Sequence, residues 1–284
     1  MPVSTVRATT ERHGATMRRL PSADTAAPVG PGVERLIVEM DGSLVPRVDT
    51  THDGAAEAPR DGRKRRRLSW VEARLCLAHA PGSVTPRFGG TLGDVTAAGD
   101  QLRACAVAAG GGPDTQVHAV GDGAVWITEQ VERVFGAQAR YLLDFYHLCD
   151  YLAAAADAVA GPDPRAWMDE KKTWLKANRW PEVLTLLRPA VESDDVAEDH
   201  APVRACVRYL TNRTAHVDYQ AALAAGLPIG SGEIESAHRY ILQSRLKRAG
   251  AWWTFENLQN MLALRLLRAN GAWEEYWHHV DQAA

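Results

Sequence analysis

The chain has 284 residues, a formal net charge of −3 and apolar residues at 46% of its positions, which is typical of a soluble globular protein. It contains no run of about 18 apolar residues, so we expect no membrane-spanning helix and no membrane partner. The basic N-terminus lacks the apolar segment of a secretory signal. The four cysteines lie far apart, which indicates reduced, mostly buried thiols in a cytoplasmic protein rather than a zinc site.

The first part of the chain predicts a leader followed by strands. Residues 1–33 show no hydrophobic period and predict a disordered leader or a linker remnant. Residues 34–40 predict a buried strand that runs into Asp41-Gly42 and continues through residues 44–46. A second strand is expected over residues 68–79, and a short third strand near residues 85–88.

Helices and strands alternate in the next part of the chain. A run of three glycines and a proline ends the first of these helices. The expected elements are a helix over 92–109, a strand over 117–120, a helix over 126–135, a strand over 141–143 and a helix over 145–159.

This order, three strands followed by strand–helix alternation, predicts an α/β fold with a mixed sheet. It is the element order of the RNase H-like fold. We divide the fold into a first core part over residues 34–160, a helical insertion over 161–226 and the C-terminal helices of the core over 227–284. The insertion therefore precedes the helix that carries Glu235.

Three acidic residues stand at the ends of predicted elements: Asp41, Asp122 and Glu235. In an RNase H-like sheet the first strand is central and the fourth lies beside it, which would bring Asp41 and Asp122 together. A later helix supplies the third carboxylate. Converging carboxylates can hold two Mg²⁺ ions roughly 3.5–4 Å apart for phosphoryl transfer, and Mn²⁺ is a possible substitute. The pattern predicts metal-assisted chemistry on a phosphodiester.

Each of these residues also has a structural interpretation. Asp41-Gly42 between apolar runs is by itself a hairpin-turn signal, and Asp122 between glycines suits a turn or a helix cap. Glu235, in the first turn of a helix, gains from the helix dipole without any metal. Glu233 is the alternative catalytic glutamate, two positions earlier on a different side of the helix.

Asp144 and His147 follow the predicted strand over residues 141–143. Structurally, Asp144 suits the N-cap of the next helix, and His147 suits a satisfied core or rim position. Functionally, a histidine at this strand end could orient a metal-bound water or contact phosphate. The sequence leaves both interpretations open.

Basic residues are concentrated near the C-terminus. Residues 204 to 268 include nine basic and only four acidic residues. The local charge therefore favours binding of a polyanion, although the net charge of the whole chain does not. The predicted DNA-binding residues are Arg239, Arg245, Lys247 and Arg248. The alternative is a solvated helix end whose cations compensate the dipole. The run over residues 63–67 is either a phosphate-binding loop or a disordered charged loop.

Several blocks together resemble the DDE transposases of bacterial insertion sequences, in particular the Kra-type group, which is related to the Mutator-like transposases. The blocks are VGDGAVWI over 120–127, LDFYH over 143–147, GSGEIE over 230–235, RLKR over 245–248 and Trp253. The resemblance covers about residues 34–275 in matching order. It implies catalytic Asp41, Asp122 and Glu235, an RNase H-like core and a helical insertion before the glutamate. Asp144 and His147 match the Cys/Asp-x-x-His signature of such enzymes.

The expected function is therefore metal-dependent DNA strand hydrolysis and strand transfer in the transposition of an insertion sequence. The expected partners are element-end and target DNA, and a homo-oligomer on that DNA. Full-length relatives carry an N-terminal region that helps to recognise the element ends, and almost nothing precedes Glu34 here. Two alternatives follow: a truncated, non-catalytic DNA-binding transposase remnant, and an RNase H-like nuclease without strand transfer.

Overall fold

The structure is a computed structural model that describes residues 2–19, 30–49 and 67–282. The chain forms two compact units. The first unit combines Met1–Thr115 with Gly232–Ala284, and the second is Gln116–Ser231. No helix in the described ranges combines the length and apolar character needed to cross a membrane.

The first unit contains an antiparallel set of strands in the order β3-β2-β1. Leu75 and Leu77 on β2 pack into an apolar cluster with the C-terminal helices, whereas Cys76 between them lies 3.9 Å from Cys105 of α2, measured between sulfurs. Strand β2 is therefore covered on both sides, which explains why residues 75–78 are all apolar. The elements are β1 (Arg35–Asp49), β2 (Arg67–His79), β3 (Arg87–Thr91), α2 (Val95–Ala108), α9 (Gly232–Ala237), a π-helix (His238–Gln243), α10 (Ser244–Leu246), α11 (Phe255–Ala269) and α12 (Trp273–Gln282).

The Asp41-Gly42 pair lies inside β1, so its interpretation as a hairpin turn was wrong. Asp41 pairs with Leu75 and Gly42 with Arg74 in a regular antiparallel register that continues to the end of β1. The apolar residues on either side of Asp41-Gly42 belong to one long strand, and the tertiary pairing overrides the local turn preference.

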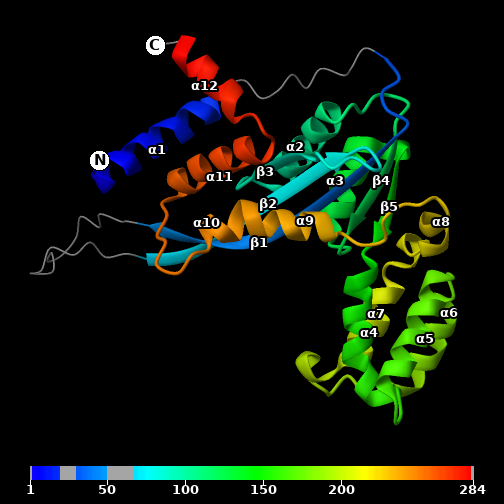
Figure 1. Cartoon of the computed structure of the whole chain (residues 1–284). Coiled ribbons are helices and arrows are strands. Elements are labelled where there is room, and N and C mark those ends of the chain that lie inside the picture. Colours follow the sequence, from blue (N-terminus) through cyan, green and yellow to red (C-terminus); the bar gives the residue numbers. More distant parts are fainter. Residues whose placement is uncertain (1, 20–29, 50–66, 283–284) are drawn as a thin grey trace, which may run out of the picture. The chain divides into compact units, whose positions relative to one another are not determined.

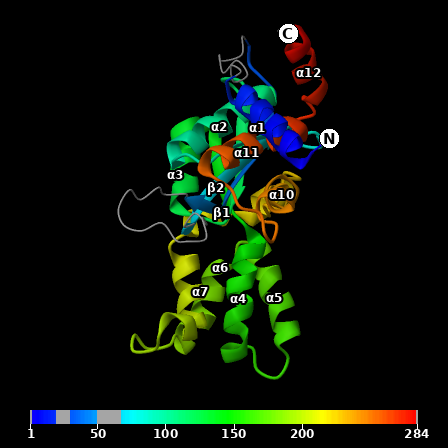
Figure 2. The same ribbon diagram turned by 90° about the vertical axis from the view of Figure 1, so that its left-hand side faces the viewer.

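The N-terminal region differs from the expected disordered leader. Residues 3–19 form α1 (Val3–Arg19), which packs against α11 in both views of the molecule (Figures 1 and 2). Gly14 is buried against Asn260, and His13 Nδ1 lies 2.8 Å from the Tyr276 hydroxyl. These tertiary contacts stabilise a helix whose residues are polar on average. Residues 20–29 and 50–66 lie outside the description, and with them four residues of the basic run over 63–67.

The second unit begins with a parallel pair of strands, β4 and β5, joined through α3. Helices α4 to α7 then pack side by side (Figure 2), and the expectation that residues 161–226 are helical is confirmed. The apolar core of this unit joins β4 and β5 to these helices. The elements are β4 (Gln116–Gly121), α3 (Val125–Phe135), β5 (Ala139–Leu143), α4 (Phe145–Val159), α5 (Pro164–Lys176), α6 (Trp180–Leu187), α7 (Pro202–Thr211) and α8 (Tyr219–Ala224).

The observed order from β1 to α4 is the predicted one, and the protein is an α/β protein with antiparallel and parallel strand pairs. Helix α4 begins and ends at the predicted residues. Strand β3 begins at Arg87, two residues later than expected, since Pro86 before it has no amide to donate to a strand ladder.

Candidate active site

Asp41 lies on β1 with its carboxylate partly accessible, since 39% of its side chain is exposed. Oδ1 accepts a hydrogen bond of 2.7 Å from the Gly42 amide, and Oδ2 lies 3.3 Å from Nε2 of His238. Burial of His238 lowers its pKa to about 4, with a smaller contribution from Lys247, although the Asp41 backbone acts in the opposite direction. The imidazole is therefore neutral at pH 7, and its contact with Asp41 is not an ion pair.

Glu235 and Glu233 both lie in the first turn of α9, and both are exposed. Glu233 already has a partner in the same unit, because its Oε2 lies 3.1 Å from Nε2 of His79 on β2. This contact places Glu233 against β2 at the helix start. Glu235 stays the predicted catalytic glutamate.

Asp122 follows β4 in the second unit. Its Oδ1 accepts a 2.8 Å hydrogen bond from the Ala124 amide, which is the turn geometry named above as the structural alternative. Tyr209 donates a 2.6 Å hydrogen bond to the Asp122 carbonyl, and Tyr141 accepts one of 2.9 Å from the Gly123 amide. The two tyrosine hydroxyls thus fix the backbone at Asp122 and Gly123. The turn uses Oδ1 of the Asp122 side chain and not Oδ2.

Gly123 is required by this turn. Its φ is +77°, a region that favours glycine, and a Cβ added there would meet Nε of Arg213. Arg213 Nε also donates a 3.0 Å hydrogen bond to the Gly123 carbonyl. The glycine after Asp122 therefore serves the turn that carries the carboxylate.

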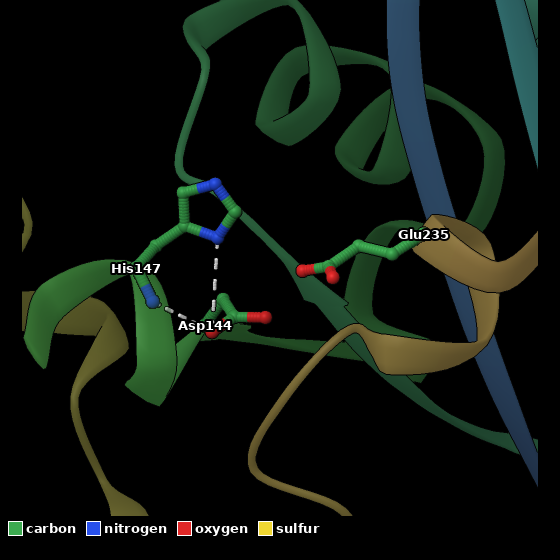
Figure 3. Close-up of side chains that lie close together, drawn as sticks. All are labelled: Asp144, His147 and Glu235. Atoms are coloured by element: carbon green, nitrogen blue, oxygen red, sulfur yellow. Dashed lines mark hydrogen bonds and ion pairs between the residues drawn. The ribbon is translucent and has the colours of Figure 1, made fainter. Parts of the chain in front are cut away.

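Asp144 is buried at the start of α4 and uses both of its carboxylate oxygens. Oδ1 accepts hydrogen bonds from the amides of Tyr146 and His147, at 2.6 and 2.9 Å, and lies 3.8 Å from Nδ1 of His147 (Figure 3). Oδ2 accepts from the amide and the hydroxyl of Ser231, each at 2.5 Å. The N-cap interpretation of Asp144 is confirmed, and Ser231 is a second partner that the sequence did not indicate.

These hydrogen bonds also set the charge of Asp144. Burial alone would raise its pKa, but the hydrogen bonds from His147 and Ser231 outweigh burial, so that the pKa lies well below its usual range. His147 itself is partly exposed. The arrangement is a buried anion that positions an accessible histidine.

Close packing explains the first glycine of the Gly-Ser-Gly motif. A Cβ at Gly230 would lie 2.5 Å from Cδ2 of the Tyr146 ring, whereas one at Gly232 would meet nothing within 4 Å. Together with the bonds from Ser231, this close approach fixes the segment before α9 to the start of α4 within the second unit.

The predicted DNA-binding residues differ in their surroundings. Arg239, Arg245 and Arg248 are exposed, and Arg245 lies 5.7 Å from the centre of the Trp253 ring. Lys247 is half-buried and donates a 2.6 Å hydrogen bond to the Ser43 hydroxyl on β1. Three of the four cations are therefore open to a polyanion.

The structure places Asp41 and Glu235 in the first unit, and Asp122, Asp144 and His147 in the second. The convergence of Asp41, Asp122 and Glu235 stays a prediction, as does their catalytic role. Sequence reasoning missed Glu39, a buried carboxylate on β1 whose Oε2 accepts a 2.7 Å hydrogen bond from the Ile234 amide. The available signal was an acidic residue inside the apolar run that precedes Asp41.

The comparison with protein families matches residues 113–282, more than half of the chain, to an uncharacterised protein family, UPF0236. The chain belongs to the UPF0236 family. The UPF0236 match begins at residue 113, just before β4, and ends with α12. It includes Asp122, Asp144, His147 and Glu235, whereas Asp41 lies before it. Among curated proteins, no match was found.

Proposed function

We propose that this chain is the catalytic domain of a DDE transposase with an RNase H-like core. It would hydrolyse a DNA strand at the end of an insertion sequence and transfer the freed strand to target DNA. The observation that carries the proposal is the bond between the Ile234 amide and Glu39, which holds the Glu235 helix against the strand that bears Asp41. Two acidic residues almost 200 positions apart thus belong to one strand–helix pair.

The donor set suits a divalent metal of the Mg²⁺ type. Asp41 and Glu235 offer accessible carboxylate oxygens, which are the ligands Mg²⁺ prefers. Asp41, Asp122 and Glu235 would hold Mg²⁺, with Mn²⁺ as a substitute. When bound, the metal supplies charge stabilisation at the phosphate and a reactive water at neutral pH.

The protein groups around these carboxylates have separate roles in the proposal. The turn held by Tyr209 and Tyr141 fixes the backbone of Asp122. Asp144, with both oxygens in use, positions His147 toward the phosphate or the attacking water instead of binding metal. Arg239, Arg245 and Arg248 bind the DNA backbone.

The proposed reaction has two steps at phosphorus. In the first, a water molecule gives up a proton and its oxygen bonds to the phosphorus, while the bond to the 3′ oxygen breaks and that oxygen takes up a proton and leaves as a hydroxyl. In the second, this hydroxyl attacks a phosphodiester of the target strand and displaces its 3′ oxygen. The protein acts by placing metal-binding carboxylates and cationic side chains around the negative charge that develops on the phosphate in the transition state.

The test uses purified protein, Mg²⁺ and DNA that carries the element ends. The wild-type protein should nick this DNA, and Asp122→Asn should abolish nicking while folding and DNA binding stay nearly intact, because shape is kept but a metal-binding charge is lost. Asp157→Asn is the matched control, since Asp157 is exposed on α4 of the same unit. Removal of the metal with a chelator should also stop nicking.

Other outcomes point to the alternatives. A wild-type protein that binds the ends but never cuts, with Mg²⁺ or with Mn²⁺, is the non-catalytic remnant. A protein that nicks without joining the freed strand to target DNA is an RNase H-like nuclease. Equal nicking by Asp122→Asn and Asp157→Asn would contradict the assignment of Asp122.

A further inference from the structure

Alternate side chains on one face of β1 contact the helical segment that follows Gly232. Glu39 accepts from the Ile234 amide at 2.7 Å, Asp41 lies 3.3 Å from His238, and Ser43 accepts from Lys247 at 2.6 Å. We call the contacts of Glu39 and Asp41 the strand–helix latch. The latch lies wholly within the first unit.

The first contact places a carboxylate in the protein interior. Only 2% of Glu39 is exposed, and burial of an isolated charge is very costly. The Ile234 amide lies in the first turn of α9, where amides have no acceptor within the helix and the helix dipole favours an anion. Glu39 and the helix start therefore compensate each other, which fixes the residue before Glu235.

The second contact involves His238, whose side chain is only 4% exposed. Neither ring nitrogen has a hydrogen bond that meets strict geometry, yet Nε2 lies 3.3 Å from Oδ2 of Asp41. His238 is the first residue of the π-helix, an element that often marks functional sites. The imidazole therefore contacts the Asp41 carboxylate and restricts the rotation of that side chain.

The two contacts match in spacing. Residues two apart on a strand are separated by about 6.6 Å, and residues four apart on a helix rise by about 6 Å. Glu39 and Asp41 are two apart, and Ile234 and His238 are four apart. The repeat distances agree, so the strand and the helix are joined side by side at two successive points.

We propose that Glu39 and His238 are positioning residues, which fix the Asp41 carboxylate and the Glu235 helix relative to each other for metal binding. This inference rests on the proposed function. Neither residue binds the metal itself. Outer partners of metal ligands commonly change metal affinity about 10–100-fold when they are removed.

The test measures binding of Mn²⁺ alone to the full chain by electron paramagnetic resonance. Glu39→Ala and His238→Ala should each weaken Mn²⁺ binding roughly tenfold or more. Glu39→Gln and His238→Gln keep a polar atom at the contact and should stay within about threefold of wild type. Asp94→Ala is the matched control, because Asp94 accepts from the Ala97 amide at the start of α2, a helix that carries no proposed site residue.

A second measurement separates this inference from the proposed function. Hydrogen exchange at the Ile234 amide should be faster in Glu39→Ala than in Asp94→Ala at equal global stability. If wild type binds Mn²⁺ and both alanine variants bind it equally well, the inference is overturned. If wild type binds no Mn²⁺, the proposed function fails. If hydrogen exchange at the Ile234 amide is equally fast in Glu39→Ala and Asp94→Ala, Glu39 does not hold the helix, and the inference is overturned as well.

Discussion

Asp144 shows what one buried carboxylate does for two segments of the second unit. It caps α4 and holds Ser231 through its other oxygen. Because hydrogen bonds lower its pKa despite burial, the folded protein binds the proton of this group less readily than the unfolded chain does. The resulting stabilisation is fully present above the unfolded pKa of about 3.9 and is lost as the pH falls below it toward the folded value.

We predict that Asp144→Asn lowers the free energy of unfolding by about 2 kcal/mol at pH 7, because charged hydrogen bonds to Ser231 and His147 are lost. Between pH 5 and pH 3 the stability of wild type should fall by about 1 kcal/mol through this group alone, since only the unfolded state takes up the proton. The asparagine variant should lack that decrease. Urea unfolding at several pH values measures both effects.

The control for this prediction is Asp157→Asn, an exposed substitution on the same helix. It should stay within about 0.5 kcal/mol of wild type and keep the wild-type pH dependence. An Asp144→Asn curve parallel to that of wild type would show that the hydrogen bonds from Ser231 do not stabilise the charged form.

Single residues were predictable where their role is local. The N-cap role of Asp144 followed from its place between an apolar strand and a helix, because capping involves amides two or three residues away. Its bond to Ser231 spans 87 positions, and Glu39 and Ile234 are 195 apart. No local pattern encodes such pairs, which is why Glu39 was missed.

At the scale of elements, Arg265 joins α11 to the π-helix that follows α9. Its guanidinium donates to the carbonyls of Tyr240 and Ile241 and to the Ser244 hydroxyl. Arg265 is one of the nine basic residues that suggested DNA binding, but its donors are directed to the protein.

We predict that Arg265→Met destabilises the first unit by about 2 kcal/mol, since several charge-assisted hydrogen bonds to the backbone are lost. Amide exchange should accelerate over residues 238–244. Arg268→Met, on an exposed side of the same helix, should change stability by less than about 0.5 kcal/mol. Thermal unfolding measures the stability, and site-resolved hydrogen exchange measures the opening of residues 238–244. Equal effects of the two substitutions would contradict the role of Arg265 in stabilising this segment.

Most elements were predictable because their apolar residues recur at the spacing of a helix or a strand. Helix α4 has the predicted bounds, since Asp144 caps its start and a clear apolar period follows. Helix α1 was not predicted, because its residues are polar on average and it packs on α11 and α12, far away in the sequence. The π-helix was not predicted either, since such elements are rare and short.

At the scale of the whole molecule, the division into two units was not foreseen. The boundary falls between Ser231 and Gly232, inside a motif that the sequence presents as one block. Membership of a core is decided by contacts across the chain: Ile229 packs with the helices of the second unit, whereas Ile234 packs with the C-terminal helices of the first.

Net charge is also a property of the whole molecule, and here it opposes DNA binding, whereas local charge favours it. With a formal net charge of −3, binding depends on the cations after Glu235. Each cation that contacts a phosphate releases counterions, so affinity falls as salt rises. Arg245 and Arg248 are exposed, whereas Lys247 is half-buried and already donates to Ser43.

We therefore predict that Arg245→Ala and Arg248→Ala each reduce the slope of log K against log salt by about one unit, and that Lys247→Ala reduces it by less. The losses should be similar for specific and unrelated DNA sequences, because phosphate contacts carry no sequence information. Arg103→Ala, an exposed substitution on α2, is the control. Fluorescence anisotropy across a salt series measures the slopes, and slopes equal to that of Arg103→Ala would show that the cations after Glu235 do not contact the DNA.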